Sequence, residues 1–136
     1  EKVLAKPGGL AETIEVSNTW RDISKTYEAL KVALSPYVDE VLCHFSHAYS
    51  DGVSLYVILI GDEQSAAKVE HQLKNIWEIA NRTALDTGAS LSHHHGIGLA
   101  RNKFFREALG DGWQLFSQMK KAIDPNCIMN PGKLGF

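Results

Sequence analysis

The chain has 136 residues, 44% of them hydrophobic and 22% charged, with a formal net charge of -2 at pH 7. This composition is typical of one globular domain and excludes disordered, fibrous and membrane-embedded chains. Without a basic excess, neither nucleic acid nor anionic lipid is an expected partner. The longest apolar run, residues 53–61, is too short for a transmembrane segment and has no signal-peptide flanks. We therefore expect a single cytoplasmic domain over residues 1–136.

The first half of the chain predicts a connector, a strand, a helix and two further strands. The opening EKVLAKPGGL has no methionine and reads as a connector, which indicates a piece of a longer protein. A short strand is predicted over residues 13–16. Apolar residues three and four positions apart then predict a helix from residue 20 until Pro36 ends it. Residues 41–47 and 53–60 alternate as strands do, and the short turn between them predicts an antiparallel pair.

The second half predicts helices around one irregular loop. Asp62 is the expected N-cap of a long helix that Gly88 ends in a left-handed conformation. A further short strand is expected near residues 89–91, and helical segments follow over residues 102–109 and 113–123 before an irregular tail. This order predicts an α+β fold, a ferredoxin-like antiparallel sheet with helices on one face followed by a helical C-terminal segment.

The aromatic side chains and the cysteines also have expected places in this fold. Tyr49 lies in a turn beside Gly52, where its phenol either projects into a cleft or packs on the sheet. Tyr56 is expected in the core, and the three tryptophans are expected to pack in helical apolar stripes. Cys43 and Cys127 have no paired spacing, so we expect two buried thiols.

The stretch SLSHHHGIG raises the question of a metal site, because it holds three consecutive histidines. The side chains of consecutive residues diverge, so His93, His94 and His95 are not expected to reach one ion together. His44 and His47 are expected on opposite faces of their strand. Ligand spacing therefore argues against a metal.

The glycines of the same stretch allow other interpretations. Gly96 and Gly98 begin a dinucleotide fingerprint, but Arg101 stands where its third glycine belongs. A helix that starts just after Gly98 would favour an anion, with Arg101 nearby. The histidines themselves fit either a polar surface loop or a positioned proton donor or acceptor, because imidazole titrates at about pH 6.5. The chain has no nucleophile elbow, phosphate loop or Cys-x-x-Cys pair, so hydrolase, NTPase and thiol-redox functions lack support.

Four segments together resemble the C-terminal domain of FAD-linked oxidases of the vanillyl-alcohol oxidase type, and most of all the alkylglycerone-phosphate synthases of ether-lipid synthesis. They are ETIEVSNTW, SHAYSDGVSLY, GASLSHHHGIGLARNKFF and AIDPNCIMNPGKLGF. The resemblance covers nearly the whole chain. It implies the substrate-binding cap portion of a larger FAD-dependent oxidoreductase or transferase, whose FAD is bound mainly by an N-terminal domain that this sequence lacks. The implied partners are that FAD domain and a small-molecule substrate, and a homodimer is compatible with it.

The same resemblance assigns roles to residues. Tyr49 falls on the family's active-site tyrosine, and together with His94 and His95 it forms the implied catalytic, proton-handling set. In the related hydroxyacid dehydrogenases a glutamate that helps to bind a metal stands where His94 stands here, so no metal is expected. Arg101 is assigned to the substrate phosphate. The residues implied near substrate or cofactor are His93, Gly96, Gly98, Arg101 and Asn130.

The implied reaction exchanges the acyl chain of acyl-dihydroxyacetone phosphate for an alkyl chain. The substrate loses a proton next to the ester, the fatty acid leaves, and a fatty alcohol takes its place. Proton removal requires a base, and a histidine fits that role. Two alternatives stay open: an FAD-linked D-2-hydroxyacid dehydrogenase of the lactate or glycolate type, and a non-catalytic binding or dimerisation module.

Overall fold

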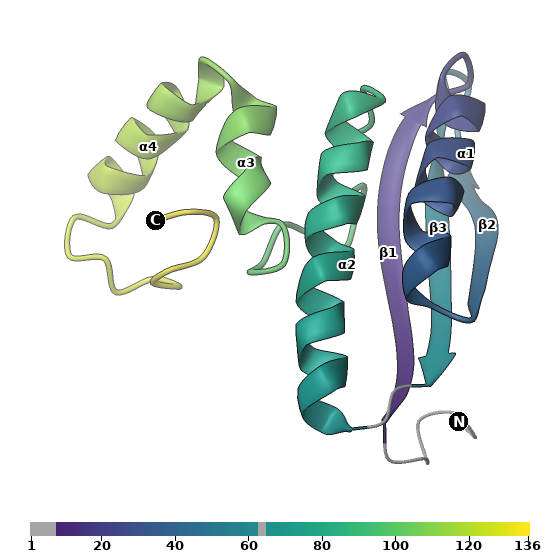
Figure 1. The fold of residues 1–136 in the computed structure, drawn as a ribbon. Helices are drawn as coiled ribbons and strands as arrows, with labels where there is room; N and C mark the ends of the chain where they lie inside the picture. The colour runs from purple at the N-terminus through teal and green to yellow at the C-terminus, as the bar shows by residue number, and fades with distance from the viewer. Residues whose placement is uncertain (1–7, 63–64) are drawn as a thin grey trace.

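The computed structural model describes residues 8–62 and 65–136, and its elements follow the predicted order (Figure 1). The predicted connector over residues 1–7 lies outside the described residues. Three strands form an antiparallel sheet in the order β1-β3-β2. They are β1 (Gly9–Thr19), β2 (Glu40–Ala48) and β3 (Gly52–Asp62). The helices are α1 (Ile23–Leu34), α2 (Ala66–Asp86), α3 (Asn102–Leu109) and α4 (Gly112–Ile123), with a 3-10 turn η1 (Ser35–Tyr37) after α1.

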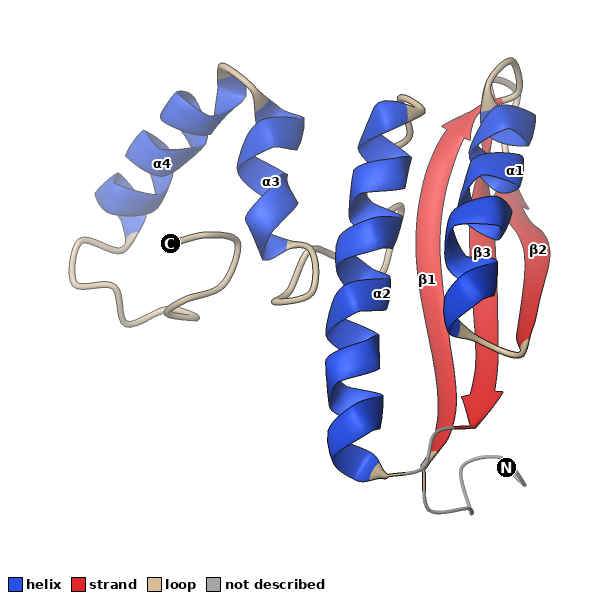
Figure 2. Ribbon diagram, in the orientation of Figure 1, coloured by secondary structure: helices blue, strands red, loops and turns tan. Residues whose placement is uncertain are grey.

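One face of the sheet is covered by α1 and α2, whereas α3 and α4 lie beyond α2, away from the strands (Figure 2). The covered face holds the core because alternate strand residues point to it. Its fully buried apolar side chains include Ile14, Val16, Leu55, Val57 and Leu59 from the strands and Leu30, Leu34, Ile76, Ala80 and Ala84 from the helices. Burying one large side chain of this kind contributes about 1.5–3 kcal/mol. The predicted α+β class, with helices on one face of an antiparallel sheet, is confirmed.

The intervening strand positions point to the other face, which no helix covers among the described residues. The register pairs Glu15 with Tyr56 and His44 with Tyr56, so these three side chains share one row across the sheet. Tyr56 is therefore only half-buried, and its predicted place in the core is wrong. Alternation fixed which residues share a face, but the packing of the helices decided which face became the core.

Two element boundaries differ from the prediction. Ser65, not Asp62, is the N-cap of α2, and its hydroxyl accepts a hydrogen bond from the amide of Lys68. Asp62 instead ends β3, where it pairs with Gly9. The same pairing extends β1 well beyond residues 13–16, because a strand continues as long as its neighbour supplies hydrogen-bond partners. The end of α2 is confirmed, since Gly88 has a left-handed φ of 74°.

Two other expectations are also corrected. Cys127 is exposed and Cys43 half-buried, so the chain does not hold two fully buried thiols. Trp20 precedes α1 and is 48% exposed, and its indole donates a hydrogen bond to the carbonyl oxygen of Tyr49 at 2.8 Å. Within the described ranges, no helix combines the length and apolar character needed to cross a membrane.

Candidate active site

The histidine loop, residues 91–98, follows α2 and lies against the helix-free face of the sheet. It is joined to the edge of β1 by one isolated bridge, in which the amide of Ser90 donates to the carbonyl oxygen of Ser17 at 2.8 Å. The two hydroxyl oxygens of the same pair lie 2.6 Å apart. Of the strand expected near residues 89–91, only this single bridge forms. The chain then crosses the row of side chains that contains Tyr56.

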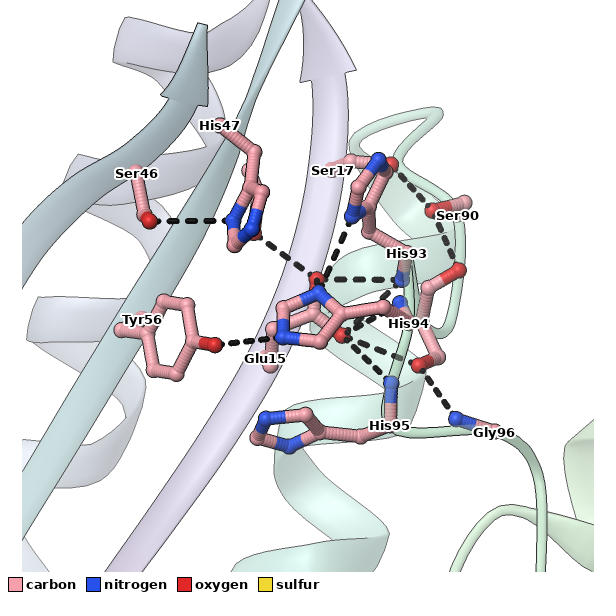
Figure 3. Close-up of polar contacts among 12 residues, drawn as sticks. Glu15, Ser17, Ser46, His47, Tyr56, Ser90, His93, His94, His95 and Gly96 are labelled. Carbon is pink, nitrogen blue, oxygen red and sulfur yellow. Dashed lines mark hydrogen bonds and ion pairs between the residues drawn. The ribbon is translucent and has the colours of Figure 1, made fainter.

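The carboxylate of Glu15 lies beneath this loop and is completely buried. It accepts hydrogen bonds from the backbone amides of His93 at 2.9 Å, His94 at 3.3 Å and His95 at 3.5 Å (Figure 3). Three consecutive amides therefore point at one side chain. Such an arrangement of N–H groups is a common anion-binding concavity, and here a carboxylate of the chain itself occupies it.

Two hydroxyl groups complete the surroundings of this carboxylate. Ser54 donates to it at 2.8 Å and Ser92 at 2.9 Å. Burial raises the pKa of Glu15, but the hydrogen bonds from His93, Ser54, Ser92 and His94 lower it more, to about 2. The side chain is therefore a permanent negative charge at physiological pH.

Arg101 binds backbone carbonyl oxygens of the same loop. Its guanidinium is buried and donates to the carbonyl oxygens of Leu91 at 2.7 Å, Gly96 at 3.0 Å and Glu15 at 3.3 Å. It also lies 4.7 Å from the centre of the Trp77 ring. Three donors of this buried guanidinium are thus used within the protein, and its role toward a substrate phosphate stays a prediction.

The side chain of His94 is at the centre of the cluster. Its Nε2 lies 2.5 Å from the hydroxyl of Tyr56, and its Nδ1 lies 3.0 Å from Nδ1 of His93. The ring of His95 lies edge-on to that of His94 at 4.6 Å. Burial lowers the pKa of His94, and the neighbouring imidazoles lower it further, while Glu15 acts in the opposite direction. A neutral imidazole of this kind can accept a proton near neutral pH.

His47 joins the cluster because β2 is irregular where it stands. The register shifts between Ser46 and Ala48, and His47 has a φ of 38°, a left-handed value that is rare for residues other than glycine. This bulge brings its ring within 4.6 Å of His94 and 5.3 Å of His93. Strict alternation would have placed it with Phe45, toward the helices.

Ring nitrogens of His47, His93 and His94 lie within 4.8 Å of one another, so these residues could hold a metal ion. An all-imidazole set suits zinc or a similar transition metal. His95 is not part of this set, which agrees with the expectation that the three consecutive histidines do not reach one ion together, but the rings of His93 and His94 do converge because the loop is neither helix nor strand. The cluster is exposed, so an ion bound there would face solvent or a bound ligand.

The remaining predicted residues divide into two groups. Tyr49 is 52% exposed, its ring lies 5.5 Å from that of His93, and both line a hollow of about 210 Å³. Gly96 and Gly98 have left-handed φ values of 78° and 53°, which the turn of the loop requires. Asn130 is separate: it lines a cavity of about 250 Å³ between α4 and the C-terminal tail, whose lining includes none of the histidines.

Comparison with known proteins shows to which family the chain belongs. The family model for FAD linked oxidases, C-terminal domain, matches residues 1–134. The chain belongs to this family. Its relatives include the uncharacterized FAD-linked oxidoreductase YgcU of Escherichia coli strain K12, 29% identical over 140 residues, which are 96% of this chain and 29% of that protein.

The alkyldihydroxyacetonephosphate synthase of Trypanosoma brucei brucei, an alkylglycerone-phosphate synthase by its other name, is 31% identical over 134 residues, which are 91% of this chain and 21% of that protein. The glycolate oxidase subunit GlcD of Bacillus subtilis is 27% identical over 130 residues, 95% of this chain and 26% of that protein. A solved structure of an alkyldihydroxyacetonephosphate synthase has a TM-score of 0.51 and 18% identity, over 93% of this FAD-linked oxidase domain and 20% of that chain. The domain thus spans less than a third of these proteins, and the solved structure confirms its fold.

Three residues of the site were not singled out from the sequence. Glu15 could have been noticed as a charged residue inside a strand, at a position that faces away from the apolar side chains on either side of it. Tyr56 occupies such a position as well, opposite Glu15. His47 had no local signal, because a bulge is decided by the pairing of two strands.

Proposed function

We propose that residues 1–136 form one domain that carries catalytic residues of a larger FAD-dependent enzyme, and that its reaction is the acyl-to-alkyl exchange of alkylglycerone-phosphate synthases. One observation carries the proposal: Tyr49 and the three consecutive histidines gather on the helix-free face of the sheet, with Nε2 of His94 hydrogen-bonded to the Tyr56 hydroxyl. The likeness to the trypanosomal synthase supports the same reaction. A cytoplasmic location remains a prediction.

The residues of the cluster suit the removal of a proton from carbon. His94 or His95 acts as the base, and the hydroxyl of Tyr56 fixes the direction of the His94 ring. The phenol of Tyr49, at the hollow beside His93, is placed to donate a hydrogen bond to a substrate oxygen. FAD, when bound, supplies the flavin chemistry at the carbon whose substituent is exchanged.

The helix-free face also fits the cofactor. The aromatic rings of Tyr49 and the histidines lie exposed there, so a planar ring system can be set against them. We propose that FAD is bound mainly by another part of the same protein and meets this face at the histidine loop.

An FAD-linked D-2-hydroxyacid dehydrogenase is the second candidate. The observation that favours it is the convergence of His47, His93 and His94, which could bind a metal that orients a substrate carboxylate. The likeness to the glycolate oxidase subunit agrees with this alternative. It needs a metal, whereas the exchange reaction uses the same histidines as free bases.

The full-length protein loaded with FAD distinguishes the two. It is offered acyl-dihydroxyacetone phosphate with a fatty alcohol, and separately a panel of D-2-hydroxy acids with an electron-accepting dye. An alkyl product without dye reduction supports the exchange reaction, and dye reduction by a hydroxy acid supports the dehydrogenase. Unchanged turnover in Tyr49→Phe and His95→Ala variants would instead favour a non-catalytic binding or dimerisation module.

A further inference from the structure

A completely buried carboxylate needs an explanation, and Glu15 is one; a group beside it that could carry a positive charge is the His94 ring, whose Nδ1 lies 3.6 Å from Oε1 of Glu15. Burying a charge is costly unless strong hydrogen bonds replace its hydration. The guanidinium of Arg101 donates to the backbone oxygen of Glu15. The carboxylate itself accepts hydrogen bonds from amides of the histidine loop and from the hydroxyls of Ser54 and Ser92.

Most of these donors belong to the histidine loop itself. The hydrogen bond between Glu15 and His93 joins residues 78 positions apart in the chain. It therefore attaches the loop to β1, an element of the core sheet.

The attachment determines where the rings point. Because the amides of His93, His94 and His95 converge on one carboxylate, the backbone of the triplet curves around it. This curvature brings Nδ1 of His93 to 3.0 Å from Nδ1 of His94, although consecutive side chains diverge in helices and strands. It also aims Nε2 of His94 at the hydroxyl of Tyr56.

Arg101 complements the attachment at the ends of the loop. It binds the carbonyl oxygens of Leu91 and Gly96, which flank the triplet, while Glu15 binds the amides between them. In a segment without helix or strand hydrogen bonds, two buried side chains thereby satisfy the amides of the triplet and the carbonyl oxygens on either side of it.

We infer that Glu15 is a positioning residue for the histidine triplet: its carboxylate fills the concavity formed by the three amides and so sets the direction of the rings that handle the proton. The importance of those rings for turnover rests on the proposed function, but their placement by Glu15 does not.

The test compares the full-length protein, loaded with FAD, with its Glu15→Gln and Glu15→Asp variants. Glutamine keeps the size of the side chain but replaces one accepting oxygen by an NH₂ group that cannot accept from the amides. Aspartate keeps the charge but withdraws it by one methylene. Glu12→Gln is the matched control, because Glu12 lies on the same strand and bonds to the indole of Trp77 instead of the loop.

Crystal structures of the four proteins give the readout that does not depend on activity. In Glu15→Gln, and less in Glu15→Asp, we expect the loop to move and the hydrogen bond between Tyr56 and His94 to be lost, with Glu12→Gln unchanged. An unmoved triplet in Glu15→Gln would overturn the inference, whatever the activity.

Kinetics give the second readout. We expect kcat per bound FAD to fall about 100-fold in Glu15→Gln with a smaller change in KM, the result of misplacing a reacting group by about 1 Å. A lower Tm with unchanged kcat per bound FAD would show a purely structural role and also overturn the inference. If the rings move but the parent protein catalyses neither candidate reaction, the proposed function fails while the positioning role stands.

Discussion

At the scale of single residues, the site depends on one buried negative charge and one hydrogen-bonded pair. Glu15 has a pKa of about 2 in the folded protein, against an ordinary value of 4.5. The Tyr56 hydroxyl and Nε2 of His94 lie 2.5 Å apart on the sheet face above it. Each of these groups gives a prediction that a single substitution can test.

The first prediction concerns stability against pH. Because the folded pKa of Glu15 is depressed, its contribution is fully present above pH 4.5 and is lost as pH falls toward 2. The shift corresponds to about 3 kcal/mol at pH 7. Glu15→Gln should therefore lower the Tm of the full-length protein at pH 7, and the gap to the parent should shrink by pH 3. A gap that stays constant from pH 7 to pH 3 would contradict this assignment.

A second prediction concerns the Tyr56 hydroxyl. Tyr56→Phe removes the group that orients the His94 ring, so kcat should fall about 10-fold or more, as when a proton-transfer group loses its alignment. Steady-state kinetics on whichever candidate substrate proves active give the measurement. Tyr27→Phe is the control, since Tyr27 lies on α1 and its hydroxyl contacts only Lys31 among the described hydrogen bonds. An equal loss in both variants would rule out a specific role for Tyr56.

At the scale of elements, the site is built on irregularities of otherwise regular strands and helices. A bulge in β2 turns His47 toward the loop, and the left-handed Gly88 ends α2 so that the chain can return to β1 at Ser90. The left-handed φ of His47 is a strained conformation for a residue other than glycine, and strain of this kind commonly occurs at functional sites and costs about 1–3 kcal/mol per residue. The regular parts of the same strands provide the core that compensates for it.

The bulge gives a third prediction. Glycine adopts the φ of 38° at position 47 without strain, so His47→Gly should leave the Tm unchanged or raise it. His47→Val should lower stability by about 1–2 kcal/mol, because a β-branched residue is poorly tolerated there. Thermal unfolding of both variants in parallel provides the measurement. Equal Tm values for glycine and valine would show that the left-handed backbone is not maintained in solution.

At the scale of the whole molecule, one face of the sheet makes the core and the other carries the candidate active site. The histidine loop lies on that second face, which α1 and α2 leave uncovered. A second group of exposed apolar side chains lies on α4 and the tail, where Ile123 is 71% and Ile128 78% exposed. Both features agree with a domain that works against other parts of a longer FAD-linked oxidase.

This arrangement gives a fourth prediction. If FAD is bound mainly outside these residues, a protein consisting of residues 1–136 alone should purify without flavin absorbance and stay colourless after dialysis against excess FAD. The full-length protein, prepared in the same way, should be yellow. Stoichiometric FAD on the isolated domain would contradict the division of roles proposed here.

The sequence by itself determined the order of the elements, the α+β class and the His93–His95 candidates, because periodicity and a rare motif are local properties of a chain; Tyr49 became a candidate through the family resemblance. Only the tertiary structure revealed Glu15, His47 and Tyr56 as parts of the site. Glu15 and His93 are 78 positions apart, and the bulge at His47 depends on how two strands pair. Tyr56 was placed in the core because alternation groups residues by face without saying which face the helices will cover. Long-range hydrogen bonds, strand pairing and the choice of buried face depend on the whole chain, and local sequence does not encode them.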